Sequence, residues 1–326
     1  MSLIVLDLEW NQSSTGREPE AASLPFEIIE IGAVRLGDGC RMIGEFSELI
    51  KPQVYTKMHT YTSKLIHLQM KQLEKGSPFQ EVMERFFQWC SREDLICTWG
   101  SSDVTELQRN LLFFGLEPIG RGPVPYLDVQ KLFSLAYEED RKIRRNLEYA
   151  VDFLKIEKDI PFHRAFSDAY YTAAVLKALV EKDASLLDYI SYDVTFPPTG
   201  REEEIHARFR NYEKYITRVF PTKEALLSDR EVKALPCFVC GKNLRLTIRW
   251  FSTNDRHYYA AGVCEKHGYM KGKIRVRHLE GDSVFAVKTT KLTDPTEMRD
   301  IEKKHNKTAM LRMRRRQGGS QEDQKS

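Results

Sequence analysis

Apolar residues are spaced along the chain in two ways, and the two spacings predict two kinds of element. Short runs rich in β-branched and apolar residues, bounded by Gly, Pro or polar positions, are typical of strands. Apolar residues that recur every three or four positions predict helices instead. We expect strands at 4–10, 26–36, 41–50, 94–100 and 124–129, and helices at 62–68, 79–91, 101–115, 129–138, 146–154 and 167–182. Strands mixed with helices in this order predict an α/β layered domain over residues 1–185, built on a mixed five-stranded sheet.

The pattern changes after residue 185. Apolar residues at helical spacing predict an amphipathic helix over 205–219 within a helical linker at 186–235. Residues 236–293 have the alternation of strands and predict a small β-rich domain. The remaining residues, 294–326, are highly charged and are expected to be disordered.

Composition and charge indicate which partners and which cellular location to expect. The 326 residues are 41% hydrophobic, enough for an ordinary core, and carry a formal net charge of +3. Residues 237–326 hold 20 Lys+Arg and 10 Asp+Glu, so the first 236 residues are acidic overall. An acidic front part suits a cation-binding site, and a basic back part suits a polyanion. The chain begins without a leader pattern and has no apolar run of membrane length, so we expect a cytoplasmic protein without a membrane partner.

Acidic residues interrupt the apolar segments at three places. Asp7 and Glu9 lie two positions apart in the first strand, so both carboxylates project from one face. Asp103 follows a short strand at the start of a helix, and Asp168 lies near the start of a late helix, five positions after His163. Crowded carboxylates repel one another unless a cation lies between them. Several carboxylates with a histidine base are what metal-assisted phosphodiester hydrolysis requires.

The stretches IVLDLEWN, SSDVTELQRN and HRAFSDA together resemble the motifs of the DEDDh 3′-5′ exonucleases, the DnaQ-like group. The run from EIIEIGAV to IKP is most similar to the Eri-type and bacterial sporulation-inhibitor exonucleases. The resemblance covers residues 1–185 and implies a ribonuclease H-like fold. It also implies hydrolysis of single-stranded nucleic acid from the 3′ end to nucleoside 5′-monophosphates, with two Mg²⁺ or Mn²⁺ ions.

The resemblance implies a role for each signature residue. Asp7 would bridge the two ions, Glu9 and Asp168 would complete the inner metal site, and Asp103 would hold the outer metal. His163 would be the general base.

Residues near the first motif and in the loop after Lys51-Pro52 are candidates for gripping the substrate, because related enzymes hold the terminal base there. Aromatic side chains are suited to stacking on bases. The candidates are Leu8, Trp10, Asn11, Met58, His59 and Tyr61.

A second set of candidate metal ligands lies in the C-terminal part. Cys237 and Cys240 form one closely spaced pair, and Cys264 and His267 form another. Four such ligands make a closed, structural Zn²⁺ site, so residues 236–293 are expected to form a zinc ribbon. His257 or His278 remain alternatives for the fourth ligand.

Two other functions stay open at this point. The domain could be a non-catalytic nucleic-acid-binding or regulatory module, or another ribonuclease H-like enzyme such as an endonuclease or transposase. RNA is weakly favoured over DNA, and no protein partner is indicated.

Overall fold

The computed structural model describes residues 2–13, 22–66 and 68–322. The chain divides into two compact units, Met1–Phe196 and Pro197–Ser326, and each contains a six-stranded sheet. Among the described residues, no helix is both long and apolar enough to cross a membrane.

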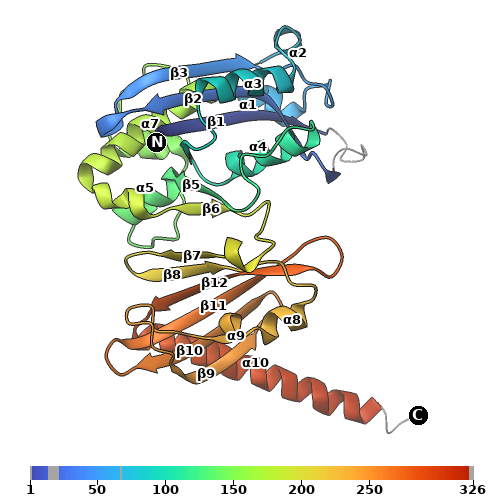
Figure 1. Cartoon of the computed structure of the whole chain (residues 1–326), viewed down its shortest axis with the longest axis vertical. Coiled ribbons are helices and arrows are strands. Elements are labelled where there is room, and N and C mark those ends of the chain that lie inside the picture. Colours follow the sequence, from blue (N-terminus) through green and yellow to red (C-terminus); the bar gives the residue numbers. More distant parts are fainter. Residues whose placement is uncertain (1, 14–21, 67, 323–326) are drawn as a thin grey trace. The chain divides into compact units, whose positions relative to one another are not determined.

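The sheet of the first unit is mixed (Figure 1). Its strands are β1 (Leu3–Gln12), β2 (Phe26–Leu36), β3 (Met42–Leu49), β4 (Leu95–Thr98), β5 (Val124–Asp128) and β6 (Ser191–Asp193), in the order β3-β2-β1-β4-β5-β6. β1 pairs antiparallel with β2 and parallel with β4. The five expected strands are present, but the expected number is wrong by one. β6 has three residues, too few for a detectable alternation, and it joins the sheet only by pairing with β5.

Helices cover both faces of this sheet. They are α1 (Thr60–Ile66), α2 (Met70–Leu73), α3 (Phe79–Trp89), α4 (Ser102–Phe113), α5 (Val129–Tyr137), α6 (Leu147–Phe153) and α7 (Ala165–Lys182). Side chains of α3 and α4 pack with Ile4, Leu6 and Leu8 on one face. Those of α5, α6 and α7 pack with Val5 on the other face. Because strand residues alternate between faces, Asp7 and Glu9 project on the side of Val5, where α7 lies.

The second unit is a β-sheet domain. Its strands are β7 (Ile205–Arg208), β8 (Tyr212–Ile216), β9 (Arg245–Ser252), β10 (His257–Cys264), β11 (Gly268–His278) and β12 (Val284–Leu292), in the order β7-β8-β12-β11-β10-β9. The helix expected over 205–219 is therefore wrong. Its residues form β7 and β8, because β8 pairs with β12 far along the chain. The β-rich region is accordingly larger than the small domain expected at 236–293.

Helices lie on both faces of the second sheet as well (Figure 1). The short helices α8 (Lys223–Ser228) and α9 (Arg230–Lys233) pack against Ile274 and Val276 of β11. α10 (Pro295–Glu322) packs through Ile301 against Phe251 and Ala261, so the expectation of disorder for this segment is wrong. Residues 323–326 lie outside the described part of the chain.

Candidate active site and metal centre

The carboxylates expected to act together do meet in the first unit. Carboxylate oxygens of Asp7, Glu9 and Asp168 lie within 4.8 Å of one another, and all three residues are half-buried. Asp103, at the start of α4, is 5% exposed. Its Oδ1 accepts a hydrogen bond at 3.2 Å from the backbone N–H of Leu8, the residue between Asp7 and Glu9. This bond holds the fourth carboxylate against β1.

The close approach of α7 to the sheet depends on Gly32. Gly32 is the register partner of Asp7 on β2. A Cβ atom at Gly32 would lie 2.1 Å from the backbone nitrogen of Phe166 and 2.2 Å from the carbonyl carbon of Ala165. Only a glycine therefore lets the first turn of α7 reach the strands and bring Asp168 beside Asp7. The pairing of β1 and β2 also shifts register between Glu9 and Trp10, an irregularity of the kind that re-aims side chains near active sites.

The fold raises the pKa of all four carboxyl groups of the cluster. Burial, followed by repulsion from neighbouring carboxylates, raises the pKa of Asp7 well above its usual range. Burial likewise raises the pKa of Glu9 to about 8, of Asp103 to about 7 and of Asp168 to about 6. At neutral pH these groups cannot all ionise without a positive counter-charge. Carboxylate oxygens are the ligands that Mg²⁺ and Mn²⁺ prefer, so the donor set fits such ions.

His163 lies in the segment before α7, as expected, and is exposed. Its φ is +65°, a left-handed conformation that non-glycine residues adopt at a cost. Its backbone N–H donates to Asp168 Oδ1 at 3.3 Å, which fixes this turn next to the carboxylates.

An ion pair that the sequence did not reveal fixes the same segment. Arg164, next to His163, donates to both oxygens of Glu30 through Nε at 3.0 Å and to Glu30 Oε1 through Nη2 at 2.6 Å. Glu30 is 1% exposed and is the register partner of Glu9. Glu30 in FEIIEIGAV and Arg164 in HRAFSDA are distant in sequence, so no local signal indicates their pairing.

The six expected substrate contacts fall into a buried group of two residues and an accessible group of four. Leu8 is 3% exposed and packs in the core, and Asn11 is fully buried. Asn11 Nδ2 donates to the carbonyls of Tyr55 and Lys57, and its Oδ1 accepts from the N–H of His59, all at 2.9 Å. The side chains of Leu8 and Asn11 are therefore not free to grip a substrate, and Asn11 instead anchors the loop.

The other four candidates retain accessible surface. Trp10 is half-buried, with its ring centroid 5.4 Å from that of Phe26. Met58 and His59 are half-buried, and Tyr61 is 65% exposed.

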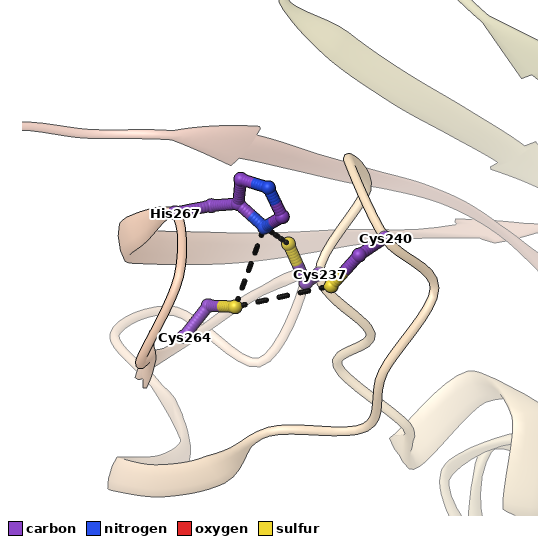
Figure 2. Close-up of side chains that lie close together, drawn as sticks. All are labelled: Cys237, Cys240, Cys264 and His267. Carbon is purple, nitrogen blue, oxygen red and sulfur yellow. Dashed lines mark hydrogen bonds between the residues drawn. The ribbon is translucent and has the colours of Figure 1, made fainter.

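The second expected metal site assembles in the second unit (Figure 2). His267 Nδ1 lies 3.5 Å from Cys237 Sγ and 3.5 Å from Cys264 Sγ, and Cys240 Sγ lies 3.9 Å from Cys264 Sγ. Tetrahedral Zn²⁺, with Zn–S near 2.3 Å and Zn–N near 2.0 Å, requires ligand atoms about 3.5–3.8 Å apart. The cluster therefore has the dimensions of a closed zinc site, and His267 rather than His257 or His278 occupies the fourth position.

Two tight turns present these ligands. The N–H of Gly241 donates to the carbonyl of Cys237 at 2.7 Å, and Gly241 has a φ of +71°, which favours glycine. Burial opposes ionisation of Cys264, but N–H groups of Lys266 and His267 and the side chains of His267 and Cys237 outweigh it and lower the pKa of this thiol to about 6. A thiolate at neutral pH is the form that binds zinc.

Carboxylates that converge from β1, α4 and α7 of a layered α/β unit are the donor set that metal-assisted phosphodiester hydrolysis uses. The model of the exonuclease family RNase_T matches residues 4–176. The chain belongs to this family, and it is a nuclease of the DEDDh, DnaQ-like type.

Individual proteins are similar to the same part of the chain. A probable 3′-5′ exonuclease KapD of Bacillus subtilis is 26% identical over 191 residues, covering 57% of this chain and 88% of that protein. A PolC-type DNA polymerase III of Clostridium perfringens is 27% identical over 168 residues, covering 50% of this chain and only 10% of the polymerase. The nuclease domain of 3′hExo, a DEDDh family member solved with rAMP, is 17% identical with a TM-score of 0.48, covering 56% of this chain and 92% of that one.

Proposed function

We propose that the protein hydrolyses single-stranded nucleic acid from the 3′ end and releases nucleoside 5′-monophosphates. The observation that carries the proposal is the convergence of Asp7, Glu9 and Asp168 within 4.8 Å, with Asp103 held against the same strand. The 3′-5′ direction is supported by the similarity to KapD, whose name gives that activity.

The acidic side chains would hold two Mg²⁺ or Mn²⁺ ions. Asp7 would serve both ions, Glu9 and Asp168 would complete one site, and Asp103 would contribute to the other. The ions would supply charge neutralisation for the attacking and leaving oxygens of the phosphodiester. The raised pKa values of the carboxyl groups support this assignment, because metal binding would return these groups to their ionised state.

His163 is the proposed general base that removes the proton from the attacking water. The exposed imidazole beside the carboxylate cluster is available to water, and histidine is the side chain that most often serves as a general base. The left-handed backbone at His163, held by Asp168 and by the neighbouring Arg164–Glu30 pair, limits where the ring can move.

The loop after β3 is the proposed holder of the 3′-terminal nucleotide. Asn11 fixes this loop to β1, and Tyr61 presents a largely exposed ring beside it. Trp10, Met58 and His59 are the further proposed contacts. RNA remains weakly favoured over DNA, the Cys237–Cys240–Cys264–His267 cluster is proposed to hold one structural Zn²⁺, and the cytoplasmic location stays a prediction.

The test uses the full chain with 5′-labelled single-stranded RNA and DNA of one sequence, with Mg²⁺, with Mn²⁺ and without added metal. We expect products shortened stepwise from the 3′ end, and none with Asp7→Asn. A substrate with a blocked 3′ end should resist. Internal cutting of the blocked substrate would indicate an endonuclease, and binding without cutting would indicate a non-catalytic module; either result would overturn the proposal.

A further inference from the structure

The second unit contains a groove that the nuclease chemistry does not use. It has a volume of about 690 Å³ and is bordered by α8, α9 and the strands β9, β10 and β11. Its floor is apolar, with Leu227, Val232 and Ile274 among its lining residues. Two aromatic side chains, Trp250 and Tyr258, also line it, and both are half-buried. The groove therefore has the volume for a nucleotide, and it is lined by two rings on which a base can stack.

Every charged residue that lines the groove is cationic. These residues are Lys233, Arg245 and Arg249, and all three are exposed. Within residues 2–13, 22–66 and 68–322, none of the three makes an ion pair. Other basic residues of this unit are neutralised within the fold: Arg218 by Glu204 and Asp229, and Lys271 by Glu297. The rim of the groove thus holds positive charge that the fold leaves without an anion.

Trp250 is held in a fixed orientation. Its Nε1 donates to the carbonyl of Lys233 at 2.8 Å, which ties the ring to α9. The ring also packs against the backbone of β11, because a Cβ atom at Gly272 would lie 2.6 Å from Trp250 Cη2. An aromatic ring that is already ordered loses little entropy when a base stacks on it, which favours binding.

We propose that this groove binds a segment of single-stranded nucleic acid, with a base stacked on Trp250 and phosphates on Arg245 and Arg249. Aromatic rings beside unpaired cations on a β-sheet are the combination that such segments require. Acidic peptides share the need for cations but gain nothing specific from a flat stacking surface. The inference rests on the proposed function for its choice of a nucleic acid over other anions, and it gives the β-sheet domain a role in holding the substrate.

The test measures binding of fluorescein-labelled oligouridylate and oligothymidylate of roughly 15 nucleotides by fluorescence anisotropy. The full chain carries Asp7→Asn so that the oligonucleotide is not cut. We expect Arg245→Ala/Arg249→Ala to raise Kd about ten-fold or more. It should also reduce the slope of log affinity against log salt by about 1.4, at ~0.7 for each lost phosphate contact.

The matched control is Arg275→Ala/Arg277→Ala. It removes two positive charges, as the groove variant does, but from the face of β11 opposite Ile274. Among the described residues, neither Arg275 nor Arg277 makes an ion pair. We expect this control to change Kd less than about three-fold. Trp250→Ala should raise Kd by roughly 5-fold or more, and Trp250→Phe should restore most of the binding. If Trp250→Ala does not fold, the arginine pair alone decides.

Three results would overturn the proposal: groove variants that bind as tightly as their parent, a control variant that loses as much affinity, or polyglutamate that binds the groove when neither oligonucleotide does. Hydrolysis of a nitrophenyl ester of thymidine 5′-monophosphate by the active chain separates this proposal from the nuclease reaction. The groove variants should turn this small substrate over at the parent rate. If the parent hydrolyses nothing, the proposed function fails, and the binding result still judges the groove.

Discussion

Replacing Glu9 by glutamine should stabilise the metal-free protein while it removes activity. The fold raises the pKa of Glu9 from 4.5 to about 8, chiefly through burial and then through Asp168. A carboxyl group with a raised pKa binds protons more tightly in the folded state, so the folded protein loses stability as the pH rises from about 4.5 to about 8. At 1.36 kcal/mol per unit, this amounts to roughly 5 kcal/mol when Glu9 is fully ionised. Relaxation and solvent reduce the recoverable part to about 2–3 kcal/mol.

Thermal melts at pH 5 and pH 9 measure this effect. The buffers contain no chelator, because a chelator would also compete for the zinc proposed at the Cys237 cluster. For a unit of this size, ~2–3 kcal/mol corresponds to an increase in Tm of about 4–12 °C. We expect that increase for Glu9→Gln at pH 9 and little change at pH 5. Added Mg²⁺ should raise the Tm of the parent and have less effect on the variant.

Glu27→Gln is the matched control on the neighbouring strand. Glu27 is 1% exposed, and its two carboxylate oxygens accept hydrogen bonds from the N–H groups of Gln53, Val54 and Tyr55. Losing these charge-assisted bonds should destabilise the protein by about 1–3 kcal/mol at pH 9. If Glu9→Gln melts at or below the temperature of its parent at pH 9 without metal, the account of crowded carboxylates is refuted.

Further predictions concern packing, the ion pair, metal affinity and zinc. Gly32→Ala should cost about 3 kcal/mol or more in chemical denaturation and abolish hydrolysis, whereas Gly44→Ala on β3, whose nearest contact would be 3.6 Å, should fold normally; equal stability of the two would contradict the packing argument. Arg164→Lys should lower kcat about ten-fold with KM little changed, because it loosens the turn that carries His163; an unchanged kcat would exclude this positioning role. Mn²⁺ affinity measured by calorimetry should increase between pH 6 and pH 8 with release of protons, since Asp168 and Glu9 titrate near these limits; a flat profile would argue against ligation by these groups. Metal analysis should find one zinc per chain, which Cys264→Ser should remove together with the cooperative melting of the second unit; an unchanged melt without zinc would make the site dispensable.

Most of the first unit could be predicted from its sequence because each element carries its own local pattern. The short apolar run of β1 and the recurring apolar residues in α7 need no distant partner to be recognised. The paired acids on β1 likewise follow from strand geometry alone. The convergence of Cys237, Cys240, Cys264 and His267 was predictable for a similar reason, since the two residues of each pair are close in sequence.

The errors arise where distant partners decide the structure. Ile205, Phe209, Tyr212 and Ile216 fit a helical period, yet the chain turns between β7 and β8 and pairs β8 with β12. The charged composition of α10 hid the few apolar side chains, such as Ile301, that anchor it on the sheet.

The same limitation applies to the active site. The Arg164–Glu30 pair and the loop contacts of Asn11 link segments far apart in sequence. Leu8 and Asn11 were expected to contact the substrate because they adjoin the first motif, but both side chains are buried.

Titration of the full chain with Mn²⁺ tests the central claim most directly, because electron paramagnetic resonance distinguishes free from bound ions. The account predicts two bound Mn²⁺ per chain at pH 8, and fewer with Asp7→Asn, in parallel with the loss of hydrolysis. Undiminished binding in Asp7→Asn, or hydrolysis by the parent without any bound divalent ion, would contradict the claim that these carboxylates form a metal-dependent nuclease centre.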